Sequence, residues 1–131
     1  MDLQPGATHE VSLTVTDEHT ADRFGNRGVR VFATPSVVAL LENAAHGMLR
    51  PHLAAGASTV GTMIEIRHLA ATPVGMTVRA RATLVDIAGR RYLFSVEAWD
   101  DKEKIAEGRH ERFVVADLHA FLARAATKGE G

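Results

Sequence analysis

The chain has 131 residues, with 15 lysines and arginines against 16 aspartates and glutamates, a formal net charge of -1 and no cysteine. This length suits a single domain with a core of its own, so we expect one domain over residues 1–131. The lack of cysteine excludes disulfides and thiolate metal sites. The balanced charge and an aromatic content of 5% argue against a nucleic-acid partner.

The sequence carries no signal for export or for membrane insertion. Residues 1–10 lack the basic start and the apolar centre of a signal peptide. No stretch is apolar for long enough to span a bilayer. The absence of cysteine agrees with a reducing compartment. We therefore expect a soluble, cytoplasmic protein with no membrane partner.

The first predicted elements, in chain order, are a strand and a loop. Apolar and polar residues alternate over residues 10–16, as in a half-buried strand. Residues 17–30 are polar and contain Gly25 and Gly28, which predicts a loop. Because the loop precedes the longest helical pattern of the chain, it could act as a lid, although most such loops are plain connectors.

The central element is a helix predicted over residues 34–52. Thr34 is suited to cap it, and Pro35 is suited to the first helical position, where no N–H is needed. Apolar residues recur at helical spacing over much of its girth, namely Val37, Val38, Leu41, Ala44, Ala45, Met48 and Leu49. A helix that is apolar over so wide a face must be wrapped by other elements.

One acidic residue interrupts this apolar face. Glu42 lies four residues after Val38 and three before Ala45, where a buried side chain is expected. An unpaired carboxylate is costly to bury. Three explanations are open: a functional role, partial exposure, or an ion pair with a core arginine.

Four strands and a short helix are predicted to follow the central helix. The strands cover residues 60–68, 77–87, 91–100 and 105–115, the helix covers residues 118–125 after a cap at Asp117, and residues 128–131 form a loose tail. Short turns join the last three strands, which makes the sheet mostly antiparallel. The fold class is therefore α+β, with the sheet curled over the central helix. Open sheet edges and one open sheet face favour a homodimer.

Alternation assigns the polar side chains of two strands to faces. In the strand over residues 60–68, the even-numbered positions from Val60 to His68 are predicted to face the core. His68 is therefore a second polar residue aimed at apolar surroundings. In the last strand, His110 and Arg112 share a face opposite Glu111.

Three of these polar residues form a candidate catalytic set. Thr34 supplies a hydroxyl at the helix start, Glu42 a carboxylate and His68 an imidazole that titrates near neutral pH. The N–H groups of the helix start also favour developing negative charge. Each residue has a plain alternative: a helix cap for Thr34, exposure or pairing for Glu42, and a core histidine for His68.

The sequence predicts no metal and no cofactor. His46 and His52 are six residues apart and cannot share a helix face, so a histidine metal site is not expected. No glycine-rich phosphate loop or dinucleotide fingerprint is present.

Several motifs in a fixed order resemble the fluoroacetyl-CoA thioesterase branch of the hotdog-fold thioesterases. They are Val31-Phe32-Ala33-Thr34, Glu42, Gly61-Thr62, the sequence HLAATP at residues 68–73 and the sequence GRHER at residues 108–112. The resemblance covers residues 29–115, most of the predicted domain.

This resemblance implies a hotdog fold, in which an antiparallel sheet wraps around one long central helix. It also implies a homodimer, which could assemble further, with active sites at the subunit interface and acyl-CoA as the substrate. Thr34, Glu42 and His68 match the catalytic threonine, carboxylate and histidine of the family. Gly61 matches the glycine whose backbone N–H holds the thioester oxygen, and Arg112 matches an arginine that supports the site.

The loop before the helix differs from the fluoroacetyl-selective form of the family. That form has phenylalanines that make an apolar lid, whereas Gly25 and Gly28 stand at those positions here and Phe24 is displaced by one. The difference argues against fluoroacetyl selectivity. It favours a more open or differently shaped pocket that accepts a small or medium acyl group. A non-catalytic dimer that binds acyl-CoA or another small ligand, and a hydratase, are the alternatives.

Overall fold

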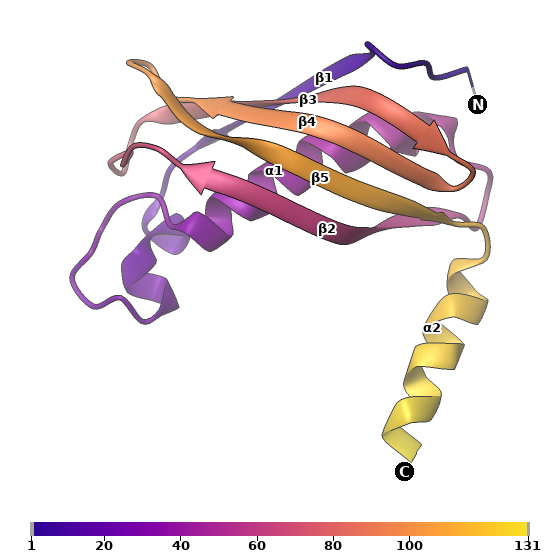
Figure 1. Ribbon diagram of the computed structural model, residues 1–131. Coiled ribbons are helices and arrows are strands. Elements are labelled where there is room, and N and C mark those ends of the chain that lie inside the picture. The colour runs from indigo at the N-terminus through magenta and orange to yellow at the C-terminus, as the bar shows by residue number, and fades with distance from the viewer. Residues whose placement is uncertain (1, 131) are drawn as a thin grey trace.

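The computed structural model describes residues 2–130 and confirms the α+β class: an antiparallel sheet curves around one long helix, and a second helix follows at the C-terminal end (Figure 1). The strands are β1 (Thr8–Thr14), β2 (Ser58–His68), β3 (Thr77–Ala88), β4 (Arg91–Trp99) and β5 (Lys104–Val115). Their order in the sheet is β1-β3-β4-β5-β2, so β1 and β2 form the two edges.

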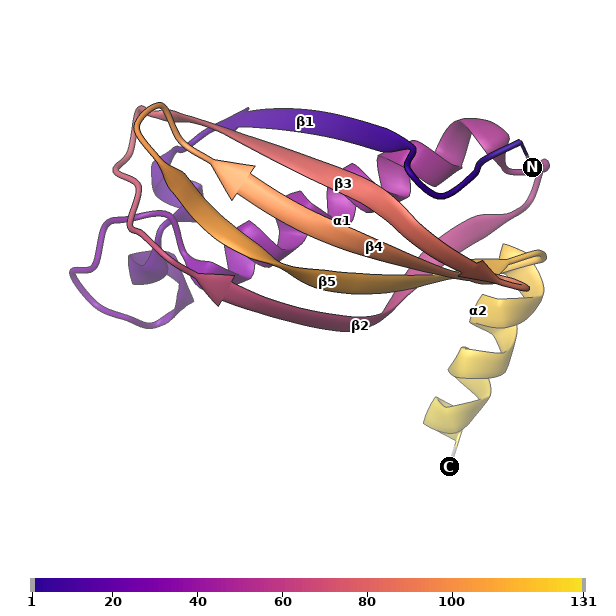
Figure 2. The same ribbon diagram turned by 45° about the horizontal axis from the view of Figure 1, so that its top comes forward.

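The central helix α1 (Thr34–Leu49) lies against the face of the sheet that curves around it (Figure 2). A 3₁₀ turn (Arg50–His52) follows, so the predicted helix over residues 34–52 is confirmed except for its last turn. The apolar stripe packs into the core, and the side chains of Val37, Leu41, Ala44, Ala45 and Leu49 have no exposed surface. Removal of this stripe from water is the main stabilising contribution of the helix.

The start of α1 differs from the prediction. Ala33, not Thr34, occupies the cap position, and no side chain makes a capping hydrogen bond there. Pro35 does lie in the first turn, as predicted. The expectation that Thr34 caps its own helix is wrong, because its hydroxyl is used in another contact.

A bulge in β2 changes the predicted alternation. Gly61 is paired with Arg112 and Met63 with Glu111 on β5, so Thr62 is an extra residue between them. The Thr62 hydroxyl bonds to Glu111, on the side of the sheet away from α1. The predicted inward orientation is therefore wrong for Val60 and Thr62, while Thr59 and Gly61 face α1 instead.

Beyond the bulge the predicted register holds. Ile64 and Ile66 pack against the core, and His68 ends the strand on the same face. Contacts at its two ends fix the direction of β2: Thr59 meets His46 late in α1, and His68 meets Thr34 at its start. β2 therefore runs antiparallel to α1.

The C-terminal helix α2 (Leu118–Thr127) points away from the sheet and extends past the β2 edge (Figures 1 and 2). Asp117 caps it as predicted, accepting a hydrogen bond of 2.9 Å from the Ala120 N–H. Residues 128–130 continue as a 3₁₀ turn instead of a loose tail, and residue 131 lies outside the described residues. No helix within residues 2–130 is long and apolar enough to cross a membrane.

Gly108 provides a test of the close pairing between β5 and β2. A Cβ atom built on Gly108 would overlap the backbone of Glu65 and Ile66, and a backbone cannot move aside as a flexible side chain can. We expect Gly108→Ala to lower the free energy of unfolding by about 1–3 kcal/mol or more, measured by urea denaturation. Gly129→Ala is the control, because nothing lies within 4 Å of the added Cβ. Equal midpoints for the two variants would contradict the close approach.

Candidate active site

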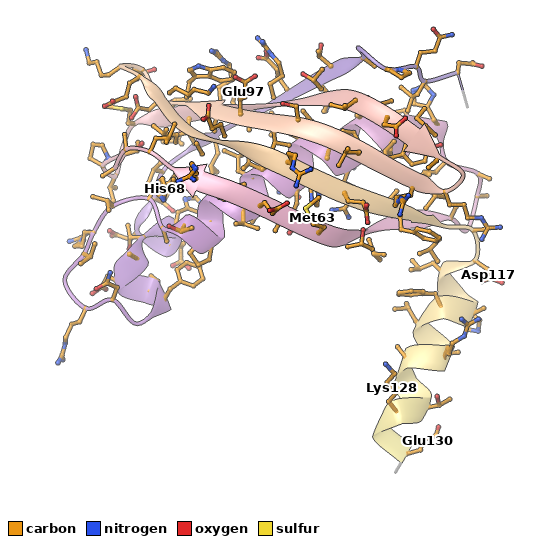
Figure 3. All side chains as sticks on the ribbon, viewed as in Figure 1. Met63, His68, Glu97, Asp117, Lys128 and Glu130 are labelled. Carbon is orange, nitrogen blue, oxygen red and sulfur yellow. The ribbon has the colours of Figure 1, made fainter. Side chains whose placement is uncertain are left out.

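The hydroxyl of Thr34 and the imidazole of His68 are in direct contact. Thr34 Oγ1 lies 2.8 Å from His68 Nδ1, a hydrogen-bond distance between the first turn of α1 and the last residue of β2. Figure 3 shows His68 at the end of β2, next to the loop that precedes α1. We call these two residues the Thr34–His68 pair.

Backbone hydrogen bonds hold both members of the pair in place. The Phe32 N–H donates to the Thr72 carbonyl at 2.8 Å, which fixes the segment that leads into α1. The Leu69 N–H donates to the Ile105 carbonyl at 2.7 Å, directly after His68. The Thr72 side chain is fully buried and donates to Asp100 Oδ2 at 2.8 Å. The residue that accepts the bond from Phe32 is therefore itself held in the core.

The environment of His68 favours a neutral ring. Burial lowers its pKa from the ordinary value of 6.5, and the Ala70 backbone opposes this shift in part. Within residues 2–130, His68 Nε2 is buried and has no well-formed hydrogen bond. A neutral imidazole can accept a proton at Nδ1 from the Thr34 hydroxyl, which is the first requirement of general-base catalysis.

A second group of polar residues lies farther along α1. Glu42 Oε2 is 3.3 Å from Arg112 Nη1 and 4.0 Å from His110 Nε2. A Cβ atom on Gly61 would overlap Glu42 Oε2, so only glycine lets the carboxylate approach the backbone of β2. We call Glu42, Gly61, His110 and Arg112 the Glu42 cluster.

Arg112 is the best-held member of this cluster. Its Nε donates to Thr59 Oγ1 at 2.8 Å, and its Nη2 donates to the Thr59 carbonyl at 3.0 Å. Burial lowers the pKa of the guanidinium, and the neighbouring Glu42 carboxylate raises it. Of the three explanations open for Glu42, partial exposure and pairing with a core arginine both apply: its side chain is 38% exposed and is paired with Arg112.

The Thr34–His68 pair and the Glu42 cluster do not meet within one chain. Thr34 and Glu42 are eight residues apart, which corresponds to a rise of about 12 Å along the helix. Among residues 2–130, no hydrogen bond or ion pair joins Glu42 to either member of the pair. The structure thus brings together two of the three candidate catalytic residues and keeps the third apart.

Two residues beside the Glu42 cluster were not expected there from the sequence: Thr59, which was not singled out, and His46, which was considered only as a metal ligand. Thr59 links Arg112 to His46, whose Nδ1 lies 2.6 Å from Thr59 Oγ1. The signal that could have found them is Gly61 itself, since a glycine inside a strand often marks a bulge or a close approach of another group. A bulge there would have turned Thr59 toward the helix.

The described residues hold no candidate metal centre. Within residues 2–130, no group of three or more histidine, cysteine, aspartate or glutamate side chains is placed to bind a metal ion. The Thr34–His68 pair and the Glu42 cluster offer a hydroxyl, imidazoles, a carboxylate, a guanidinium and backbone N–H groups.

Comparison with known proteins supports this fold. A crystal structure of a single-residue variant of the fluoroacetyl-CoA-specific thioesterase FlK superposes with a TM-score of 0.92, at 32% identity over 98% of each chain. A hot-dog-like protein from Thermanaerovibrio acidaminovorans has a TM-score of 0.86 over 98% of this chain and 97% of its own, at 23% identity, which supports the fold alone. The protein is a hotdog-fold thioesterase.

The family can also be stated. Residues 15–117 match the family model described as FlK, fluoroacetyl-CoA-specific thioesterase. A fluoroacetyl-CoA thioesterase from Streptantibioticus cattleyicolor is 41% identical over 98 residues, which are 75% of this chain and 70% of that protein. The chain belongs to this family of thioester hydrolases, and the resemblance read from its motifs is confirmed.

Three histidines that are wholly or partly buried make stability depend on pH. Burial lowers the pKa values of His46, His68 and His110 below the ordinary 6.5. In the unfolded chain these rings take up protons at higher pH than in the folded chain, so the free energy of unfolding falls as the pH drops below about 6.5. We expect a lower urea midpoint at about pH 5.5 than at about pH 7.5.

The His68→Gln variant is the matched comparison for this measurement. It removes one of the three rings whose pKa is lowered, so its urea midpoint should fall less over the same pH interval. A midpoint that is independent of pH in the parent protein would contradict the lowered pKa values of these imidazoles.

Proposed function

We propose that this protein hydrolyses small or medium acyl-CoA thioesters at a site shared between two copies of the chain. In this proposal the Thr34–His68 pair of one protomer faces Glu42 and Gly61 of its partner. The observation that carries the proposal is the 2.8 Å contact between the Thr34 hydroxyl and the half-buried imidazole of His68, whose pKa burial lowers, in a thioesterase fold.

The separation of the two groups supports the homodimer. Both groups are open within one chain, because Thr34 is exposed and the Glu42 side chain is 38% exposed. Carbonyl chemistry needs its charged groups close together and shielded from water. A second copy of the chain can supply both conditions, since β2 is an edge strand with one side unpaired within the chain.

Symmetry makes this arrangement reciprocal. Val38 marks the midpoint between the two groups along α1, and residues 64–65 mark the midpoint along β2. Because α1 and β2 run antiparallel, these midpoints lie at the same level of the fold. A twofold axis at that level sets each Thr34–His68 pair opposite the Glu42 cluster of the other protomer, as a self-complementary interface requires.

Each proposed role follows from the chemistry of the group. His68 takes a proton from the nucleophile, which is either the Thr34 hydroxyl or a water molecule, and passes it to the leaving thiolate. Attack by water forms the acid directly, whereas attack by Thr34 forms an acyl ester that water then hydrolyses. The Gly61 N–H, at the bulge of the edge strand, stabilises the negative charge that develops on the carbonyl oxygen. Glu42 orients the attacking group, and Arg112 holds Glu42. The products are a carboxylic acid and free CoA thiol.

The shape of the loop before α1 supports the proposal that the substrate carries an acyl group other than fluoroacetyl. Gly25 and Gly28 have φ angles of 95° and 82°, in the left-handed region that favours glycine, and no heavy atom lies within 4 Å of a Cβ atom built on either. Asp22 accepts a 2.8 Å hydrogen bond from the Gly28 N–H, which holds the loop in this shape. A loop without bulky side chains at these positions leaves room for larger acyl groups.

A cytoplasmic location, inferred from the cysteine-free sequence, stays a prediction, as does assembly beyond a dimer. The same holds for the carrier: a CoA thioester and an acyl-carrier-protein thioester present the same carbonyl to the site. Assay of one acyl group on both carriers separates these two substrates.

Hydrolysis of a series of acyl-CoA esters tests the proposed activity. We expect release of free thiol from acetyl-CoA and longer esters, and a loss of roughly a hundredfold or more in kcat/KM for His68→Ala, because a positioned acid–base group is removed. His52→Ala is the matched control, since its imidazole is exposed in the turn after α1. Equal rates for the parent and His68→Ala would remove His68 from the mechanism, and tight binding without turnover would favour a non-catalytic acyl-CoA-binding dimer.

Mixed dimers test the shared site. His68→Ala and Glu42→Gln chains with different affinity tags can be co-expressed, and the heterodimer can be purified over both tags. Each homodimer should be inactive, whereas the heterodimer should recover about half of the wild-type rate, because one of its two sites then combines two unaltered halves.

A site built from a single chain predicts a different result for the heterodimer. If all catalytic groups of one site came from one chain, both sites of the heterodimer would carry a defect. The rate would then stay at the level of the inactive homodimers, and the shared site would be wrong even if both variants are inactive alone.

A further inference from the structure

We propose that His110 is a positioning residue: its neutral imidazole holds Arg112 against Glu42 and at the same time fixes the bulge that carries Gly61. The inference rests on the proposed function, because it concerns how two of the proposed site residues are held. The hydrogen-bonding capacities of the groups around His110 lead to it.

The tautomer of His110 follows from its two partners. Nδ1 lies 2.8 Å from the Met63 carbonyl, which can only accept, so Nδ1 carries the proton. Nε2 lies 3.2 Å from Arg112 Nη1, and a guanidinium can only donate, so Nε2 must accept. Both requirements are met by the neutral ring, and burial lowers the pKa of His110 in agreement with this state.

The Met63 carbonyl connects His110 to the bulge. The register of β2 shifts between Gly61 and Met63, and Figure 3 marks Met63 in the middle of this edge strand. A strand with an extra residue has lost regular ladder contacts at that point. The bond from the fully buried His110 ring therefore fixes the backbone directly after Gly61, where the carbonyl oxygen of the substrate is proposed to bind.

The second contact of His110 acts on the ion pair. Arg112 Nη1 faces both His110 Nε2 and Glu42 Oε2, at 3.2 Å and 3.3 Å, so the acceptor on the ring and the carboxylate share this end of the guanidinium. Thr59 holds the other edge of the guanidinium by two bonds. Without His110 Nε2 as an acceptor, Arg112 Nη1 would keep Glu42 as its only acceptor and would shift its position.

A proton added to His110 would oppose this arrangement. The groups that face Arg112 are Glu42 from α1, Thr59 from β2 and His110 from β5, while His46 reaches it through Thr59. Arg50 also acts on His46, while Glu42, 4.0 Å from Nε2, and Glu111 act on His110 and favour its protonation. A protonated ring would place an N–H against the guanidinium N–H groups, so the arrangement requires His110 to stay neutral.

Substitution of His110 tests the inference by its effect on kcat and KM. We expect His110→Phe to lower kcat at least about tenfold and to change KM less than about threefold, because the groups around the carbonyl shift while the contacts to the rest of the thioester do not. His52→Phe is the matched control at an exposed histidine. His110→Asn, which keeps an N–H for the Met63 carbonyl but is too short to reach Arg112, should fold and should still be slower than the parent.

A double variant shows whether His110 acts through Glu42. If it does, adding His110→Asn to Glu42→Gln should cost less than about twofold in kcat, because the group being positioned is already lost. His110→Gln, with an amide long enough to reach Arg112, should recover at least about a third of the parental rate, since the amide oxygen can accept from the guanidinium.

The possible outcomes separate this inference from the proposed function. Parental activity in Glu42→Gln would overturn the proposed function and, with it, the inference. A slow Glu42→Gln enzyme combined with parental kinetics in His110→Asn, or with a double variant that multiplies the two losses, would overturn the inference alone. Failure of His110→Gln to restore the rate, with thermal stability restored, would also reject it.

Discussion

The buried guanidinium of Arg112 is the contact on which the arrangement of this protein depends. It joins three elements that are distant in sequence, since it reaches Glu42 on α1, Thr59 on β2 and His110 next to it on β5. A buried charge of this kind is tolerated only when its donors are satisfied and a carboxylate is near. Its partners therefore fix the position of α1 along the strands that it packs against. That position decides which residue of α1 lies next to Gly61 and which lies next to His68.

Most of the fold could be predicted from the sequence, because helical and alternating apolar patterns report which face of each element is buried. The central helix, the four strands after it and the cap at Asp117 follow from such patterns. The bulge at Thr62 could not be derived in this way, since one extra residue inverts the faces before it and leaves those after it unchanged. The strand order could not be predicted either, because β2 pairs with β5 although β3 and β4 lie between them in the sequence.

The residues proposed for the site stand out in the sequence, whereas their grouping does not. Glu42 and His68 are polar in registers where apolar residues are expected, Thr34 opens the central helix, and the motifs around them identify the family. Spacing along one chain suggests a single cluster, whereas the geometry gives two groups about 12 Å apart along the helix. Sequence patterns describe which face of each element is buried within one chain, so they do not show that these residues fall into two groups.

The two left-handed glycines of the loop before α1 also bear on how substrate range can change within this family. Placing an aromatic side chain on such a backbone costs about 1–2 kcal/mol at each position. A phenylalanine at Gly25 or Gly28 would therefore not simply add a wall to the acyl pocket, since the loop would first have to adopt another path. At these two positions, the path of the loop and the size of the side chain therefore cannot change independently of each other.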